Sequence, residues 1–269
     1  MVKKLGKKRK EQTPLSKVLS SSDSRKVVLN HFFGKLTPHE IRLAVTSLEN
    51  HRHFKQAISS HKHNFKFIYS KMTPESTLIK NIGWCIGLLE THKEKIQFFL
   101  EKENDLLLCF FRGNFDACLT IIDDLEKICG VSLWSIGIRG SLLSLSNKTE
   151  EKRELTLEIN NNSSTNNFLK TTANLLANKY DDNSTLPAFN NFAEQKIRRS
   201  FIGGLLHFLM YKIVPINYSF AYDFNEILNK EKNTTAIDIL NCLLDMVRFS
   251  IIKSTKGDYY HESQLVISN

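Results

Sequence analysis

The chain has 269 residues, of which 41% are hydrophobic and 24% charged, so most of it has the composition of a folded protein. It contains only 11 glycines and 5 prolines, which argues against collagen-like chains and against all-β folds that need many tight turns. Its five cysteines are odd in number and scattered, which argues against a disulfide scaffold.

The net charge of +9 is concentrated near the N-terminus, where residues 1–35 hold ten bases and two acids. Residues 1–23 contain too few apolar side chains to form a core, so we expect a disordered basic tail. Such a tail binds nucleic acid, anionic lipid or an acidic partner through charge alone, or serves only as a solubilising arm. The candidate nucleic-acid contacts are Lys3, Lys4, Lys7, Lys8, Arg9 and Lys10.

The body that follows the tail begins with two helix-start signals. Thr37-Pro38-His39-Glu40 offers an N-cap residue, a proline at the first helical position and a glutamate at the third. Thr73-Pro74-Glu75 repeats this pattern. Apolar residues at helical spacing follow each signal: Ile41, Val45 and Leu48 after the first, and Leu78, Ile82, Cys85 and Leu89 after the second.

The middle of the chain predicts four consecutive helices, over 93–111, 114–129, 132–145 and 149–159. Gly130 is placed to end the second helix, and Ser132 to cap the third. Asp123, Asp124 and Glu126 lie off the apolar stripe of the second helix, so we expect them on a solvated face.

Two loops and two further helices complete the pattern. Residues 160–167 contain only Asn, Ser and Thr and form the clearest loop, and 181–187 form the second. A helix is predicted over 188–213 with Gly203-Gly204 inside it, where the glycines allow close helix approach or a kink. The helix over 234–253 is predicted to be mostly buried, with Ile239, Leu243 and Val247 inside and one polar stripe of Asp238, Asn241, Asp245 and Arg248.

The periodicity therefore predicts an all-α fold: an irregular, α-solenoid-like helical-repeat stack of antiparallel helices over 24–253, followed by a C-terminal tail at 254–269. No secretory signal is visible, and the most apolar stretch is too short for a membrane span. We expect a soluble, intracellular, cytoplasmic protein, or a nuclear one if the source is eukaryotic and the tail acts as an import signal.

Most motifs that carry chemistry are missing. The chain lacks a phosphate-binding loop, a dinucleotide-binding glycine pattern, a zinc-protease helix and a serine elbow. The two His-x-His pairs at His51, His53, His61 and His63 do not suit one metal, because helical residues two apart point about 200° apart. The five cysteines lie in apolar contexts and are expected to be small buried hydrophobes. We predict no metal and no cofactor.

One pair of residues is enzyme-like. Arg25 and His31 have the spacing of the catalytic motif of the HEPN ribonucleases, which are all-α, so the resemblance implies cleavage of a phosphodiester. About one such pair is expected by chance from the Arg and His content, and Lys26 stands where that family has a small polar residue. A HEPN-like ribonuclease is therefore one alternative function.

Gly113-Asn114-Phe115-Asp116-Ala117-Cys118 resembles the turn and second-helix start of a tetratricopeptide repeat, and the resemblance covers residues 104–145. Gly130 departs from the family pattern, which has a proline there, and no second copy is present. The resemblance supports a helical-repeat fold and implies no particular activity.

With no convergent catalytic set, we expect a non-enzymatic protein-interaction module or accessory subunit that binds a partner in a helical groove. The alternative is a nucleic-acid-associated protein that uses its tail.

Overall fold

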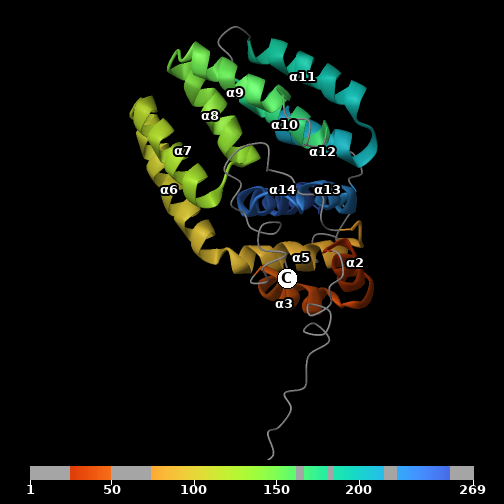
Figure 1. Cartoon of the computed structure of the whole chain (residues 1–269). Coiled ribbons are helices and arrows are strands. Elements are labelled where there is room, and N and C mark those ends of the chain that lie inside the picture. The colour runs from red at the N-terminus through yellow and green to blue at the C-terminus, as the bar shows by residue number, and fades with distance from the viewer. Residues whose placement is uncertain (1–24, 50–73, 162–166, 181–184, 215–222, 255–269) are drawn as a thin grey trace, which may run out of the picture.

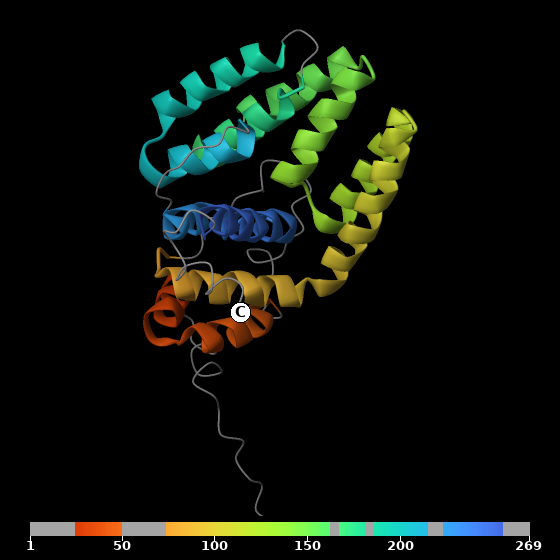
Figure 2. The same cartoon turned by 180° about the vertical axis from the view of Figure 1, so that it is seen from behind.

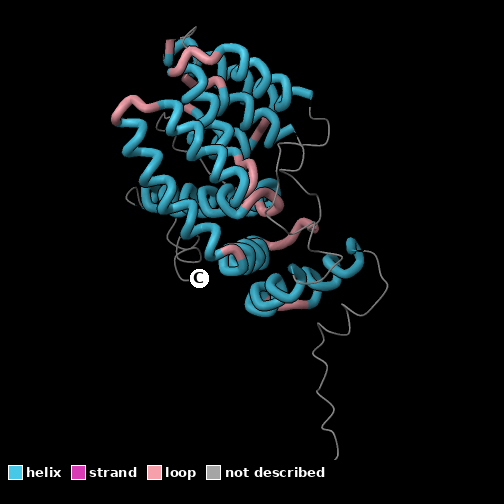
Figure 3. The backbone as a smooth tube through the Cα atoms, turned by 60° about the vertical axis from the view of Figure 1, so that its left-hand side comes forward, coloured by secondary structure: helices cyan, strands magenta, loops and turns pink. Residues whose placement is uncertain are grey.

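The computed structural model describes residues 25–49, 74–161, 167–180, 185–214 and 223–254. Within these ranges there are twelve helices and no strand, so the all-α prediction is confirmed (Figure 3). The helices are α2 (Arg25–Lys35), α3 (Pro38–Glu49), α5 (Leu78–Thr91), α6 (Lys93–Phe111), α7 (Phe115–Cys129), α8 (Leu133–Leu145), α9 (Thr149–Asn161), α10 (Asn167–Ala177), α11 (Leu186–Ser200), α12 (Gly203–Ile213), α13 (Phe224–Glu231) and α14 (Ala236–Ser254).

Helices that are consecutive in the chain mostly lie side by side. α3 packs on α5, α6 on α7, α7 on α8 and α8 on both α9 and α10. The C-terminal α14 lies in the middle of the molecule, between α5 and the layer of α10 and α12 (Figures 1 and 2). It contacts α5, α6, α8 and α13, so the last of the described helices fills the inner side of the curve that the earlier ones form.

Two predicted helix starts are confirmed, and at each of them a side chain accepts a backbone N–H that has no partner within the helix. At α3, Glu40 accepts the Thr37 N–H at 2.8 Å and Thr37 Oγ1 accepts the Glu40 N–H at 3.3 Å, which together form a capping box. Ser132 caps α8 in the same reciprocal way with Ser135. These predictions hold because capping depends only on residues within one turn of the helix end.

The predicted helix start at Thr73-Pro74-Glu75 is wrong, because α5 begins at Leu78. Thr73 lies outside the described residues, and 74–77 are not helical. A tertiary contact competes with the local signal: the Lys232 ammonium donates to the Pro74 carbonyl at 2.6 Å. Asn81 also donates to the Ser76 carbonyl, at 3.2 Å, so the segment before α5 is held by side chains rather than by helical hydrogen bonds.

The single helix predicted over 188–213 is divided into α11 and α12, and α11 begins at Leu186 within the predicted second loop. Phe201 is extended, and Gly203 has φ of +60°, which glycine adopts without strain. Gly204 is packed against the backbone that leads into α13: a Cβ there would lie 2.7 Å from the Asp223 nitrogen. The two glycines thus separate two helices and also allow a close approach.

The buried interior forms two clusters. One is built mainly from α6, α7 and α8, and the larger one from most of the remaining helices, with Leu155 of α9 packed against both. The cysteines are all free thiols, and all but Cys109 are buried, as predicted for small core residues. Burial raises the pKa of Cys85 to about 12, so this thiol is not a nucleophile at neutral pH.

In α14, Ile239 and Leu243 are buried, as the periodicity predicts, whereas Val247 is only half-buried. The prediction that Asp238 lies on the polar surface is wrong, because it is only 2% exposed. Its carboxylate accepts backbone N–H groups of α8, so a buried partner replaces water.

The predicted tails, 1–23 and 254–269, lie outside the described residues except for Ser254, which ends α14. The predicted loop at 160–167 is wrong at both ends, because α9 extends to Asn161 and α10 begins at Asn167; residues 162–166 lie outside the described residues.

Candidate functional site

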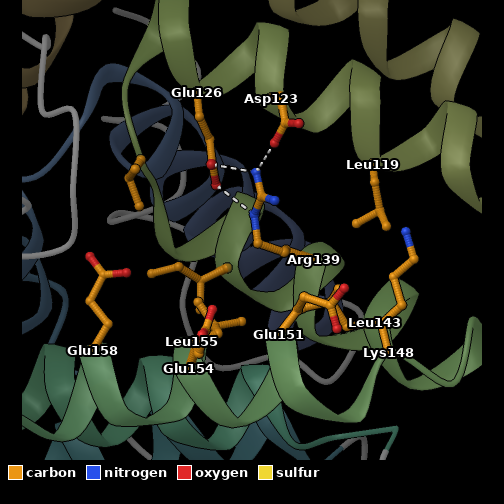
Figure 4. Close-up of a pocket in the computed structure, with 12 residues that line it drawn as sticks. Leu119, Asp123, Glu126, Arg139, Leu143, Lys148, Glu151, Glu154, Leu155 and Glu158 are labelled. Atoms are coloured by element: carbon orange, nitrogen blue, oxygen red, sulfur yellow. Dashed lines mark hydrogen bonds and ion pairs between the residues drawn. The ribbon is translucent and has the colours of Figure 1, made fainter.

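A groove of about 500 Å³ runs between α7, α8 and α9. Figure 4 shows carboxylates from α7 on one side, carboxylates from α9 on the other, and α8 between them. The lining residues are Leu119, Asp123, Glu126, Val131, Ile136, Arg139, Leu143, Lys148, Glu151, Glu154, Leu155 and Glu158. Five of these side chains are acidic and two are basic, so the lining carries a net charge of −3.

The acidic wall on α7 follows from that helix's apolar period. Cys118, Ile122 and Leu125 are buried against the neighbouring helices. This orientation turns Asp123 and Glu126 away from the core and toward the groove. The prediction that they lie off the buried stripe is confirmed, but the face they occupy is one wall of a groove that α9 completes.

Arg139 of α8 stands at the centre of the α7 wall. Its guanidinium Nη2 lies 2.7 Å from Asp123 Oδ1 and 2.6 Å from Glu126 Oε2 (Figure 4). Burial by itself would lower the pKa of Arg139, but the two carboxylates outweigh burial and raise it. This cation is therefore held by α7 and serves to fix α7 and α8 together.

The second cation of the lining, Lys148, is also paired with a carboxylate of α7. Its ammonium lies 2.7 Å from Asp116 Oδ1 at the end of the groove, and this contact raises the pKa of Lys148. Since both cations already pair with acids of α7, the glutamates of α9 determine the sign of the groove.

The α9 wall presents Glu151, Glu154 and Glu158, which are spaced by three and four residues and so share one helix face. All three are exposed. Like charges at this spacing destabilise a helix by a few tenths of a kcal/mol per pair, about 0.2–0.5 kcal/mol. A cationic ligand between the walls would remove this repulsion.

The floor of the groove is apolar. Leu119 of α7 and Ile136 and Leu143 of α8 are buried, and Val131 and Leu155 are half-buried. The groove thus combines an apolar floor with acidic walls, which matches a segment that presents apolar and cationic side chains together.

The side chains in this groove are acids, two paired cations and apolar residues. No group of three or more His, Cys, Asp or Glu side chains within the described ranges has an arrangement that would hold a metal ion. The groove acids face cations and apolar side chains, which suits binding.

Several predicted residues lie where the structure gives no side chains. Arg25 and His31 both belong to α2, but their side chains lie outside the described part, so the ribonuclease pairing stays a prediction. The same holds for the basic tail residues, which lie in 1–24, and for the four histidines in 50–73.

The turn that resembles a tetratricopeptide repeat joins α6 and α7. Gly113 has φ of +72°, and Asn114 caps α7 by accepting the Ala117 N–H at 3.1 Å. The rings of Phe115 and Phe110 lie 5.9 Å apart, and Cys118 is fully buried. The turn therefore has the local geometry that its residues predict. Membership of the repeat family remains a resemblance.

Comparison with protein families, with curated proteins and with solved structures finds no match to this chain. No helix in the described ranges has both the length and the apolar character needed to cross a bilayer.

Sequence reasoning missed the groove as a site. Its one local signal was the spacing of Glu151, Glu154 and Glu158, which indicates an acidic face on the helix predicted from 149. That signal becomes informative only when α7 supplies a second acidic wall opposite it.

Proposed function

We propose that the chain is a non-enzymatic protein-interaction module, and that a basic, amphipathic segment of a partner protein binds between α7 and α9. The observation that carries the proposal is the pairing of an apolar floor with walls whose net charge is −3. Apolar side chains of the segment would cover Val131 and Leu155, while its lysines or arginines would meet the glutamates of α9.

We propose further that α6 to α10 form an irregular, solenoid-like stack. Adjacent contacts of α6 with α7, α7 with α8 and α8 with α9 support this arrangement. The inner side of the curve holds α14, which leaves the α7–α9 face as the open groove. A partner would therefore bind on this face rather than against the inner side.

The test is fluorescence anisotropy with a labelled synthetic peptide that places leucine and lysine on opposite helix faces. The intact chain should bind it. Reversing two groove charges, Glu151→Lys with Glu154→Lys, should weaken binding by about tenfold or more, since each lost contact is replaced by a repulsion and tenfold is about 1.4 kcal/mol.

The matched control reverses two exposed acids outside the groove, Glu101→Lys with Asp105→Lys on α6, and changes the net charge equally. The affinity of this control for the peptide should stay within about twofold of that of the intact chain, because distant exposed charges are screened. Equal weakening by both double variants would show that total charge, not the groove, sets affinity.

A second candidate function is supported by the charge at the N-terminus. Residues 1–35 carry ten bases and two acids, which favours sequence-independent contact with nucleic-acid phosphates. Deleting residues 1–12 should abolish such binding and leave thermal stability unchanged. The acidic groove would repel phosphates, so the two functions would use different parts of the chain.

A further inference from the structure

A second, smaller pocket of about 280 Å³ lies on another part of the molecule, between α8, the end of α10, α12 and α14. It is lined by Leu133, Trp134, Gly137, Ile138, Ser141, Leu176, Lys179, Tyr180, Lys212, Asp238, Asn241 and Asp245. This volume is below the roughly 300–1,000 Å³ of pockets for drug-sized ligands, so it suits a smaller molecule.

The polar stripe of α14 forms one side of this pocket. Asp238, Asn241 and Asp245 are spaced by three and four residues and all line it. Asp238 is already satisfied by the backbone N–H groups of α8 and by Thr235. Asn241 differs: its amide Nδ2 is buried and has no hydrogen-bond partner among the described residues. A buried donor without an acceptor destabilises the folded chain, and a ligand acceptor would remove that penalty.

Two lysines add positive charge to the lining. Lys212 of α12 is held 3.3 Å from Glu231 and lies over the Phe208 ring at 5.3 Å. Lys179 follows α10, and burial lowers its pKa. Within the described ranges no carboxylate pairs with Lys179, which instead lies 5.7 Å from the centre of the Tyr180 ring. Its ammonium is thus partly desolvated, and none of the carboxylates that the structure describes forms an ion pair with it.

Asp245 supplies the opposite charge. Its nearest cationic partner on α14, Arg248, is 3.7 Å away and largely exposed, and the Asp245 side chain itself is only 18% exposed. Lys212 also acts on Asp245 electrostatically. The pocket therefore presents charges of both signs, together with an orphaned amide donor.

The remaining wall is apolar and preformed. Leu133 is buried, Leu176 and Ile138 are half-buried, and the Trp134 ring is held edge-on to Phe99 with centroids 4.8 Å apart. An apolar group entering the pocket would lie against these side chains without rearranging them.

We propose that this pocket binds a small zwitterion of the amino-acid class with an apolar side chain. Its carboxylate accepts from Asn241 Nδ2 and faces Lys179, its ammonium faces Asp245, and its side chain lies against Trp134 and Leu176. A ligand with both charges fits because the lining itself has two lysines and two aspartates. This site is separate from the α7–α9 groove and does not depend on the function proposed for it.

The test is isothermal titration calorimetry of the full chain with leucine and phenylalanine, and with two leucine analogues: 4-methylpentanoate, which lacks the ammonium, and 3-methylbutylamine, which lacks the carboxylate. At least one amino acid should bind with a Kd of about 1 mM or tighter. Each leucine analogue should bind at least about tenfold more weakly than leucine, since each leaves one charged group of the pocket unmatched.

Two variants locate the site. Asn241→Ala and Lys179→Met should each weaken binding by about tenfold, the cost of one charge-assisted contact. Lys196→Met on α11, which removes a lysine that also lies over an aromatic ring, should leave the affinity unchanged. Lys179 lies outside the helices, so its variant tests the site even if Asn241→Ala fails to fold.

A spectroscopic signal provides an independent check, because Trp134 is one of only two tryptophans. Ligand should change the fluorescence of the intact chain, and this change should disappear in Trp134→Phe. The proposal is overturned if neither amino acid shows binding at ligand concentrations up to about ten times the stated Kd. It is equally overturned if an analogue binds as well as leucine, or if Asn241→Ala and Lys179→Met both bind normally.

Discussion

Asp238 of α14 accepts the backbone N–H of Leu133 at 3.1 Å, so its side chain caps a helix that lies 105 residues earlier in the chain. The same carboxylate accepts the Trp134 N–H at 3.3 Å. Ser132 already caps this end of α8 locally, and Asp238 satisfies two further N–H groups that would otherwise be buried without partners. This contact fixes the central helix against α8, and Asp238 also lines the smaller pocket.

Replacing Asp238 with alanine should therefore destabilise the fold by about 2–4 kcal/mol, because a cap is lost and two buried N–H groups lose their acceptor. Urea unfolding followed by circular dichroism measures this change. Asp124→Ala is the matched control, since Asp124 is exposed on α7, and it should stay within about 0.5 kcal/mol of the intact chain. Equal effects of the two variants would rule out a structural role for the cap.

The charge of Asp238 should also make stability depend on pH. Burial raises its pKa from 3.8 to about 6, against the lowering effect of the Leu133 hydrogen bond. Between these two values the native state holds a proton that the unfolded state has lost, so the free energy of unfolding falls as pH rises. Asp238→Asn removes this titration. The stability advantage of the intact chain over Asp238→Asn should thus shrink from pH 4 to pH 7.

Urea titrations of both proteins at several pH values measure that difference, in which the contributions of other groups cancel. An advantage that grows with pH would mean that the backbone N–H groups outweigh burial and hold the carboxyl pKa below its usual value.

Gly140 should tolerate no larger residue, because α8 and α10 touch there. A Cβ at Gly140 would lie 2.3 Å from the Ala177 carbonyl oxygen, which belongs to the backbone and cannot turn away. Gly140→Ala should cost at least about 1–3 kcal/mol, the usual penalty for overpacking. Thermal unfolding gives the measurement.

The matched control is Gly34→Ala in α2, where nothing lies within 4 Å of the added Cβ. It should be neutral or stabilising by up to about 1 kcal/mol, because alanine favours a helix over glycine. If Gly140→Ala were as stable as Gly34→Ala, that result would contradict the close approach of α8 to α10 at Gly140.

Lys232 should be essential to the packing of α5 on α13. Its buried ammonium donates to Asn81 Oδ1 and Asn229 Oδ1, each at 2.7 Å, and to the Pro74 carbonyl. Lys232→Met removes the donor to the Pro74 carbonyl and to Asn81 Oδ1, while Asn229 Oδ1 keeps its contact with Asn81 Nδ2, and it should destabilise by about 3 kcal/mol. Lys230→Met, two residues away and only half-buried, should cost no more than about 0.5 kcal/mol in the same unfolding experiment.

What could be predicted from the sequence is what depends on neighbouring residues. The ends of α7 illustrate this: Asn114 caps it by reaching the Ala117 N–H, and Gly130 ends it with φ of +89°. Both act within one turn of the helix. The burial of Cys118 and Ile122 also follows from the helical period of a single segment.

What could not be predicted depends on residues far apart in the chain. Asp238 shares a stripe with Asn241 and Asp245, so its pattern resembles a solvated face until α8 supplies its partners. The local pattern at Pro74 predicts a helix start, but in the structure its carbonyl accepts a hydrogen bond from Lys232 instead. Glu126 lines a groove only because α9 packs opposite α7, and no local sequence pattern predicts how these two helices are placed.

The most direct test of the α7–α9 groove as a binding site is a charge swap across it. Anisotropy titrations would compare the lysine-bearing amphipathic peptide with one that carries glutamate at the same positions, on the intact chain and on Glu151→Lys with Glu154→Lys. The intact chain should prefer the lysine peptide, more weakly as salt screens the charges, and the double variant should move this preference toward the glutamate peptide. An unchanged ratio of the two affinities in the double variant would contradict binding in this groove.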